Sequence, residues 1–443
     1  MSDEVKKKAI NRVQARYAFR AFEDKMYQKT VEASQAGEPT CWAMAVYWQV
    51  IPILRSMGFE IIYTENFGAY SAATGVAQTY LDRSDSEGFP THLCSYARIN
   101  LGYSAMMNEL GEIPPGAPAG GIAKPTLLLS RGGVCDAGYK WFQALARYFD
   151  APLWVVEHPH PGVKEFFKEG YYEHTINFLV DSLREFVRFV EHLLGKKLDW
   201  DKLDQLVCNL DKATHLWQEI NDLRQAVPCP MHSRDFWTCM VPHYFHGDVV
   251  ESQDLYRQLY DEIKHRVDTN TGAVEEEKYR LIFSELPPWH SLGFFENLAE
   301  RGWNFVQESI NYHLRTIDLT GISDPLKRLA MISFNFHTGY FKEALKEGEN
   351  LGFLAAPYLM WTDEYKADGA FLHPLLSCRA CSVHIPYLQA RLIEARKVPS
   401  LIIEGDMCDL TRFDPADALR RAETFEETMD YYRGRREKGF TIR

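Results

Sequence analysis

The fold class can be inferred from one segment, TLLLSRGGVCDAGYKWFQALARYFDAPLWVVEHP, residues 126–159. It opens with an apolar run and a glycine-containing turn. A segment follows in which Tyr139, Phe142 and Leu145 stand three positions apart, and a second apolar run closes it. A buried strand, an amphipathic helix and another buried strand are typical of a parallel sheet that helices cover on both faces. The segment therefore predicts the α/β class.

The same alternation recurs on both sides of this segment. Further short apolar runs are CWAMAVYW (41–48), FEIIYT (59–64), RLIFSELPP (280–288), GAFLHP (369–374) and VPSLIIEGD (398–406). A long stretch, about 171–225, reads as helical and separates the two sets of runs. We expect two Rossmann-like (flavodoxin-like) parallel-sheet domains, with a helical insertion between the sheets and a functional cleft between the domains.

The expected domain limits follow from these patterns. Residues 1–36 read as a polar helical arm that ends before Gly37. Residues 37–225 form the first α/β domain, which carries Cys94 and Cys135, and residues 226–443 form the second, which carries Cys408. The carboxyl ends of parallel strands are where such domains bind ligands, so candidate residues are sought there.

Composition and charge exclude several classes of function. The net charge is −12 and no basic cluster is present, so we expect no nucleic-acid partner. No run approaches the ~20 apolar residues of a membrane span, and the N-terminus lacks an apolar signal core. These features predict a cytoplasmic protein without membrane contact, in which the nine cysteines remain thiols.

Three cysteines lie where a strand passes into a loop or helix. Cys135 follows the TLLLS run, Cys408 follows the VPSLIIEGD run between Asp406 and Asp409, and Cys94 precedes the helical run RINLGYSAMM. A thiol at a helix N-terminus should have a lowered pKa and bind metal as thiolate. The alternative for Cys135 is a buried thiol in a glycine turn. Together, the three could hold one iron–sulfur cluster in the cleft and leave its fourth iron open.

The other cysteines and the histidines have simpler interpretations. Cys208, Cys229 and Cys239 read as small buried apolar residues, and the Cys378–Cys381 pair reads as a turn near the cleft rather than a zinc or redox site. The histidines at 232, 243, 246 and 290 fit no metal-binding spacing. Glu157 and His158 follow a strand, so they are the candidates for a proton donor.

Four segments carry a resemblance to a known family: GEPTCWAMAVYW with RSMGFEIIYTENF, FPTHLCSYARINLG, LLLSRGGVCDAGYKWFQALARYFDAPLWVVEHP, and ADGAFLHPLLSCRACS with VPSLIIEGDMCDLTRF. The chain resembles a subunit of the 2-hydroxyacyl-CoA dehydratase and class I benzoyl-CoA reductase family from about residue 37 onward. The resemblance implies a [4Fe–4S] cluster whose ligands map onto Cys94, Cys135 and Cys408.

The resemblance also implies partners and a reaction. The partners would be a related cluster-binding subunit and two ATPase subunits, or a dimeric ATPase activator, with a cluster of their own. Ferredoxin would donate electrons and an acyl-CoA would be the substrate. No phosphate-binding loop G-x-x-x-x-G-K-[S/T] occurs in this chain, so ATP should bind a partner.

Three functions are open at this stage. The first is the larger catalytic subunit of a benzoyl-CoA reductase, which converts an aromatic thioester to a cyclic diene. The second is a subunit of an (R)-2-hydroxyacyl-CoA dehydratase that works through a ketyl radical. The third is an electron-relay subunit without a substrate site.

Overall fold

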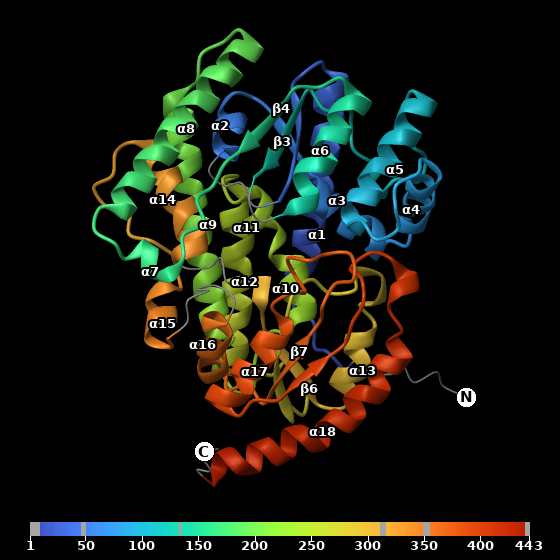
Figure 1. Cartoon of the computed structure of the whole chain (residues 1–443), viewed down its shortest axis with the longest axis vertical. Coiled ribbons are helices and arrows are strands. Elements are labelled where there is room, and N and C mark those ends of the chain that lie inside the picture. Colours follow the sequence, from blue (N-terminus) through green and yellow to red (C-terminus); the bar gives the residue numbers. More distant parts are fainter. Residues whose placement is uncertain (1–8, 46–49, 133–134, 311–315, 349–354, 439–443) are drawn as a thin grey trace.

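The computed structural model describes residues 9–45, 50–132, 135–310, 316–348 and 355–438. It contains two four-stranded sheets in which every pair of neighbouring strands is parallel (Figure 1). The first sheet has the order β2–β1–β3–β4 and consists of β1 (Thr40–Ala43), β2 (Glu60–Tyr63), β3 (Leu127–Arg131) and β4 (Leu153–Val156). The second has the order β6–β5–β7–β8 and consists of β5 (Tyr279–Phe283), β6 (Trp303–Glu308), β7 (Gly369–Leu372) and β8 (Ser400–Ile402).

The strand order is the same in both sheets and is the flavodoxin-like one. The prediction of two Rossmann-like parallel sheets is therefore confirmed. The order reverses between β1 and β3 and again between β5 and β7, so ligand sites are expected beyond the carboxyl ends of these four strands.

Two details of the strands differ from expectation. β6 was not predicted, because its sequence WNFVQE mixes polar and apolar residues although all six are buried. β1 ends at Ala43, whereas the predicted apolar run continued to Trp48. The last residues of that run, from 46 onward, lie outside the described residues.

Helices cover both sheets and connect them. In the first half they are α1 (Arg16–Gln35), α2 (Ile51–Ser56), α3 (Thr64–Ala73), α4 (Ala77–Ser86), α5 (Ser95–Leu110), α6 (Asp136–Phe149) and α7 (Val163–Phe166). α8 (Tyr171–Leu194) and α9 (Trp200–Leu223) occupy the predicted helical region. The second half contains α10 (Ser233–Cys239), α11 (Val241–His246), α12 (Glu251–Asp268), α13 (Phe294–Glu300), α14 (Pro325–Thr338), α15 (Phe341–Lys346), α16 (Ala356–Glu364), α17 (Ile385–Arg396) and α18 (Pro415–Glu437).

Helix α9 shows why the region between the sheets folds as it does. Asp199 caps its N-terminus by accepting a hydrogen bond from the Lys202 N–H at 2.9 Å. Buried residues at helical spacing, among them Val207, Leu210 and Trp217, form one apolar face. This face packs against α2 and α12, so α9 contacts elements of both halves of the chain. The domain boundary near residue 226 stays a prediction.

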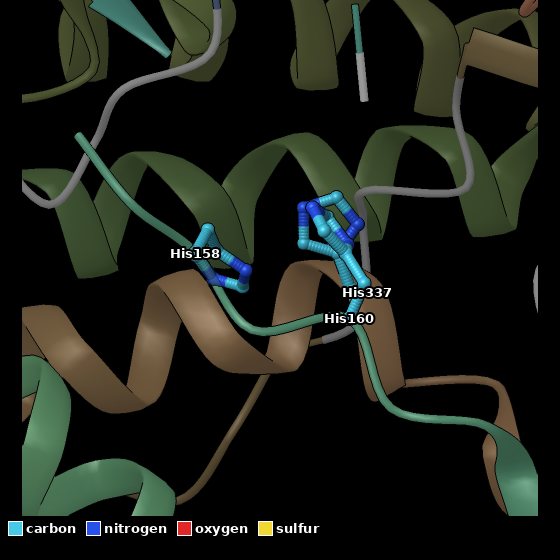
Figure 2. Close-up of side chains that lie close together, drawn as sticks. All are labelled: His158, His160 and His337. Carbon is cyan, nitrogen blue, oxygen red and sulfur yellow. The ribbon is translucent and has the colours of Figure 1, made fainter. Parts of the chain in front are cut away.

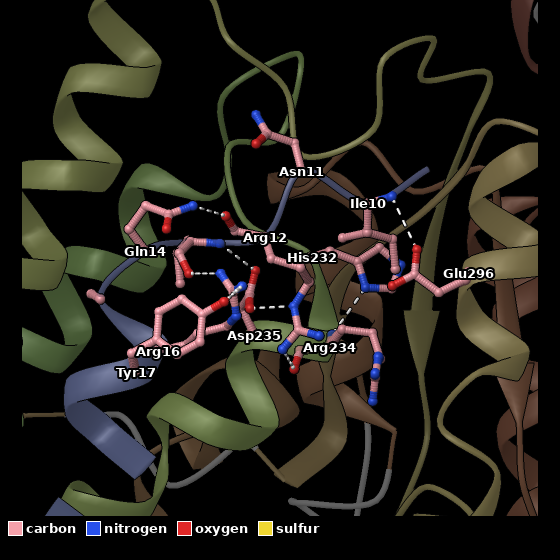
Figure 3. A network of polar contacts seen from close by, with 12 residues as sticks. Ile10, Asn11, Arg12, Gln14, Arg16, Tyr17, His232, Arg234, Asp235 and Glu296 are labelled. Atoms are coloured by element: carbon pink, nitrogen blue, oxygen red, sulfur yellow. Dashed lines mark hydrogen bonds and ion pairs between the residues drawn. The ribbon is translucent and has the colours of Figure 1, made fainter. Parts of the chain in front are cut away.

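The N-terminal arm is helical over a shorter range than predicted. α1 begins at Arg16, and residues 9–15 run without helix along the second half of the molecule (Figure 3). The Asn11 N–H donates to the Ala273 carbonyl at 2.8 Å, and the Val13 N–H donates to Asp235 at 2.9 Å. These bonds satisfy backbone groups that a helix would have bonded internally. Residues 1–8 lie outside the described residues.

Within the part of the chain that the structure describes, no helix combines the length and the apolar character required to cross a bilayer.

Candidate functional site

A cavity of about 360 Å³ lies beyond the carboxyl ends of the strands of both sheets. Met44 and Ala45 follow β1 in its wall, Arg131 ends β3, and Glu285 and Ser309 follow β5 and β6. This is the place where the strand order leads us to expect a ligand. Much of the remaining wall is aromatic and is contributed by Tyr70, Tyr96, Trp141, Trp237, Tyr244, Phe245 and Trp289.

Two of the predicted ligand cysteines line this cavity. Cys94 is the residue before α5, and Cys135 is the residue before α6, where its sulfur accepts a hydrogen bond from the Gly138 N–H at 3.2 Å. Gly138 leaves room for this sulfur, since a Cβ there would stand 3.2 Å from it and 2.3 Å from the Met44 methyl carbon. Cys135 therefore occupies the strand-to-helix position that was predicted, whereas Cys94 precedes a helix as expected but follows α4 rather than a strand.

Cys408 lies just behind the cavity wall. Its neighbour Met407 lines the cavity, while the Cys408 thiol is buried and faces the Gly68 carbonyl oxygen at 3.5 Å. Burial, together with Asp406 and then Cys94, raises the pKa of the Cys408 thiol well above its ordinary value. Cys408 and Cys94, which come from opposite halves of the chain, are thus close enough to affect one another.

The expected lowering of thiol pKa at the helix N-termini is not found. Burial raises the pKa of Cys135 to about 11, and hydrogen bonds from the Gly138 and Ala137 backbone only partly offset this. Burial, Cys378 and Cys135 raise the pKa of Cys94 well above its ordinary value. The expectation was wrong because desolvation of a buried thiolate outweighs the helix N-terminus. A bound cation would have to supply the missing stabilisation.

The described thiols are not grouped as tightly as the ligands of a single zinc ion. Sulfurs bound to one zinc ion stand about 3.8 Å apart, as the Zn–S distance and tetrahedral geometry require. Among the described residues, the thiols do not form a set of three whose sulfurs all lie within 4.8 Å of one another. In an iron–sulfur cluster each thiolate binds a different iron, so a wider spacing is required.

The aspartates beside Cys408 have structural roles. Asp406 accepts hydrogen bonds from the Cys408 and Asp409 N–H groups at 2.9 and 3.0 Å. Asp409 pairs with Arg98 of α5 at 3.1 Å. Hydrogen bonds and an ion pair within the fold thus account for both carboxylates that flank Cys408. These contacts instead join the Cys408 loop to the helix that follows Cys94.

The remaining cysteines divide into two groups. Cys378 and Cys381 line the cavity beside Cys94, and a hydrogen bond from Cys381 lowers the pKa of Cys378. Arg379 between them points outward and pairs with Asp136. None of the other four lines the cavity: Cys41, Cys229 and Cys239 are buried, and Cys208 is half-buried with Arg328 at 3.2 Å from its sulfur.

Glu65 is a candidate functional residue that the sequence interpretation missed. It lies in the first turn of α3, lines the cavity, and accepts hydrogen bonds from the Ala45 N–H and the Thr64 hydroxyl, both at 2.9 Å. Burial raises its pKa to about 7, and it is near enough to Cys135 to raise the pKa of that thiol. Its position directly after the FEIIYT run was the available signal.

Two further groups in the cavity wall are of interest. Trp141 and Trp237 both line the cavity, and their indole nitrogens are buried without a hydrogen-bond partner among the described residues. A buried donor without an acceptor is costly, so such groups often bind a ligand.

Glu157 and His158 lie away from this cavity. Glu157 lines a second cavity of about 270 Å³ together with Trp154 and Phe178. His158 is buried beside His160 and His337 (Figure 2). Burial lowers the pKa of His158 to about 3 and that of His160 to about 4, so both rings are neutral near pH 7. The suggested role of Glu157 and His158 as proton donors stays a prediction.

The four histidines of the 232–290 region are not brought together as a metal site within the described residues. His232 caps α10 by accepting the Arg234 N–H at 2.9 Å. His246 contacts Arg55 at 2.8 Å, and His290 contacts the Ser291 hydroxyl at 2.8 Å. His232, His246 and His290 each have a polar contact within the fold.

Comparison with known proteins adds a family to this geometry. A family model described as 2-hydroxyglutaryl-CoA dehydratase, D-component, matches residues 52–429. The (R)-2-hydroxyisocaproyl-CoA dehydratase alpha subunit of Clostridioides difficile is 24% identical over 414 residues, which cover 91% of this chain and 93% of that protein. The (R)-phenyllactyl-CoA dehydratase alpha subunit of Clostridium sporogenes is 23% identical over 431 residues, which cover 97% of this chain and 98% of that protein. A benzoyl-CoA reductase subunit of Thauera aromatica is 26% identical and covers 79% of each. The resemblance inferred from the sequence is confirmed.

Proposed function

Because this chain belongs to the 2-hydroxyglutaryl-CoA dehydratase D-component family, we propose that it is the cluster-binding catalytic subunit of an enzyme that reduces an acyl-CoA thioester. One observation carries the proposal: thiols from both halves of the chain converge on a single cavity at the strand ends. A cavity beside the thiols also favours a subunit that binds substrate rather than one that only relays electrons.

Cys94, Cys135 and Cys408 would hold a [4Fe–4S] cluster, which supplies single electrons of low potential when bound. The chain itself contributes the surroundings. The aromatic wall excludes water from the acyl group, and the Trp141 and Trp237 indole N–H groups are candidate donors to the thioester carbonyl oxygen. Glu65, with its pKa raised to about 7, can hold a proton in the cavity at neutral pH and release it to the substrate.

The acyl group in this proposal is aromatic. The aromatic wall offers edge-to-face and stacked contacts to a flat ring, which favours such a substrate. We place reduction of benzoyl-CoA, or a related aromatic acyl-CoA, to a cyclic diene first, supported by the similarity to the benzoyl-CoA reductase of Thauera aromatica. Dehydration of an (R)-2-hydroxyacyl-CoA is the second candidate, supported by similarity to dehydratase alpha subunits over more than nine tenths of the chain.

The partners in this proposal are other chains. The relatives are named as individual subunits of their enzymes, which implies a companion subunit for this chain as well. ATPase subunits with a cluster of their own would drive the electrons, and ferredoxin would supply them.

A substrate assay tests the proposal. The complex, purified with its partners and without oxygen, is supplied with ATP, a reduced low-potential donor and benzoyl-CoA. We expect ATP-dependent oxidation of the donor and formation of the diene. Loss of water from an (R)-2-hydroxyacyl-CoA, without net consumption of the donor, would replace the first candidate by the second. Electron flow into the chain without turnover of either thioester would refute a substrate-binding subunit.

A further inference from the structure

We propose that His158, His160 and His337 form a binding site for a divalent transition-metal ion of the zinc class, separate from the thiol cavity. Each residue offers one ring nitrogen, and these nitrogens all lie within 4.8 Å of one another (Figure 2). None of the three residues lines the thiol cavity. The site therefore shares none of its three histidines with the proposed cluster site.

The fold brings these residues together from two places in the chain. His158 and His160 lie in the loop between β4 and α7, and His337 lies in the last turn of α14. The ring centroids of His158 and His160 lie 4.6 and 4.4 Å from that of His337. The carbonyl groups at the C-terminus of a helix carry partial negative charge, which favours a cation beside His337.

Both ring nitrogens of His158 face carbonyl oxygens. Its Nδ1 lies 3.0 Å from the Pro159 carbonyl oxygen, and its Nε2 lies 3.2 Å from the Ser333 carbonyl oxygen. A neutral imidazole has one N–H group, so it can donate to only one of these oxygens. At the other carbonyl group, the unprotonated ring nitrogen and the oxygen turn lone pairs toward each other. A metal ion can bind that nitrogen once the ring turns away from this oxygen, while a hydrogen bond from the other nitrogen would orient the ring.

Metal binding requires the three ring nitrogens to move closer together. Nitrogens bound to one zinc ion stand about 3.4 Å apart, since the Zn–N distance is about 2.0–2.1 Å and the geometry is tetrahedral. Rotation of the rings can bring nitrogens that lie within 4.8 Å to this spacing. Three neutral histidines would leave a fourth position for water. His160 is exposed, so an ion can enter from solvent.

Arg131 is the group that opposes a cation here. Its guanidinium contacts His337 Nε2 at 3.2 Å, and its charge lowers the pKa of His160 after the larger effect of burial. An ion that takes Nε2 must displace this guanidinium. Because Arg131 also lines the thiol cavity, occupation of the histidine site would change the charge arrangement of that cavity.

Zinc binding to the full-length, cluster-loaded chain tests the proposal. The chain is equilibrated with buffered zinc without oxygen, and zinc and iron are counted after gel filtration. We expect one zinc per chain, and zinc X-ray absorption should show a first shell of nitrogen and oxygen at about 2.0 Å. His160→Ala should weaken zinc binding at least tenfold, and His337→Asn should do the same. Both variants should retain their iron.

The control is His174→Ala, which removes an equally exposed histidine from α8 and should leave zinc binding unchanged. A zinc shell of sulfur at about 2.3 Å would place the ion at the thiols and overturn the proposal. Equal zinc affinity in wild type and His160→Ala would also overturn it. So would binding of inorganic phosphate, but not zinc, that depends on His160. None of these outcomes bears on acyl-CoA turnover, so the proposed function stands or falls separately.

Discussion

Cys94 and Cys239 are both buried thiols, yet their surroundings differ. Cys94 lies among other thiols, and the charges of Cys378 and Cys135 raise its pKa beyond the effect of burial. For Cys239, in α10, burial has the largest effect on the pKa, and the next largest come from the charges of Asp235 and Arg12. Thiols that would repel one another as thiolates are stable together only as neutral groups or with a shared cation. This distinction separates the thiols around the cavity, which include Cys378 and Cys381, from Cys239.

The first residue-scale prediction concerns iron. Cys94→Ser, Cys135→Ser and Cys408→Ser should each lose the cluster or change its spectrum, because a serine hydroxyl is a harder and less acidic donor than a thiol. Iron and sulfide per chain, with the electron paramagnetic resonance of the reduced protein, measure this. Cys229→Ser and Cys239→Ser should keep full iron content at a cost of about 1–2 kcal/mol in stability. Full iron in Cys408→Ser, or loss only in the Cys378 and Cys381 variants, would show that the ligand set is wrong.

The second residue-scale prediction concerns Glu65. Burial raises its pKa from 4.5 to about 7, so the folded state holds a proton that the unfolded state releases. Its contribution to stability is therefore complete below pH 4.5 and is lost as the pH rises through about 7. Glu65→Gln should flatten this part of the stability–pH curve and lower turnover roughly 100-fold, as loss of a general acid does.

Wild-type turnover should also fall above pH 7. The Glu65→Asp variant, which keeps a carboxyl group, should retain part of the wild-type turnover. Iron content serves as the control and should equal that of wild type. A stability difference between wild type and Glu65→Gln that does not change between pH 4.5 and 7 would contradict the assignment.

At the scale of elements, helix α5 and the loop after β8 form one unit. Arg98 of α5 bridges Asp409 at 3.1 Å and Asp85 at 2.7 Å, and is itself buried. The Trp289 N–H donates to the Met407 carbonyl at 3.0 Å, and its indole N–H donates to the Tyr96 hydroxyl at 2.6 Å. Cys94 and Cys408 are thus held by elements that are bonded to each other.

Arg98→Met should disrupt this unit. It removes the buried one of the two cations that pair with the Asp409 carboxylate, whose side chain is 7% exposed, and leaves the more exposed Arg412 at 3.3 Å. Removing one partner of a buried pair costs about 3–5 kcal/mol. Because Arg412 remains, we expect a loss near the lower end of this range, which urea unfolding without oxygen would measure. Lys264→Ala breaks an exposed pair with Asp268 and should leave the free energy of unfolding nearly unchanged. Equal losses in both variants would show that the Arg98 bridge contributes little.

At the scale of the whole molecule, segments outside the sheets determine how the halves meet. Residues 9–15 are bound to the second half, while α1 packs against β1, β2, α10 and α11 (Figures 1 and 3). Arg20 and Glu23 of α1 line the thiol cavity. The N-terminal arm therefore closes one side of the site that both sheets form.

Asp235→Asn should loosen this closure. Asp235 accepts the Val13 N–H at 2.9 Å and pairs with Arg12 at 2.5 Å. Loss of such a charge-assisted bond costs about 1.5–3 kcal/mol, so backbone amides of residues 9–14 should exchange with deuterium at least about tenfold faster. Mass spectrometry of exchanged peptides measures this. Asp417→Asn, at an exposed pair on α18, should leave their exchange unchanged. Unaltered exchange in Asp235→Asn would show that other contacts hold the segment.

Local sequence determined the elements whose stability is local. Apolar runs such as Leu127–Leu129 predict buried strands, and the spacing of Val207, Leu210 and Trp217 predicts the face of α9, because each pattern follows from the geometry of one element. The position of Cys135 before a helix was predictable for the same reason.

Tertiary structure alone decided what depends on partners remote in the chain. β6 was not predicted because it contains the polar residues Asn304 and Glu308. In the fold, Asn304 donates a hydrogen bond to Glu277 at 2.6 Å, and Glu308 pairs with Arg224 at 2.6 Å. The pKa of Glu65, the proximity of Cys94 to Cys408, and the meeting of His337 with His158 likewise arise from packing. Burial and charge interactions depend on distances in the folded chain, which the sequence alone does not give.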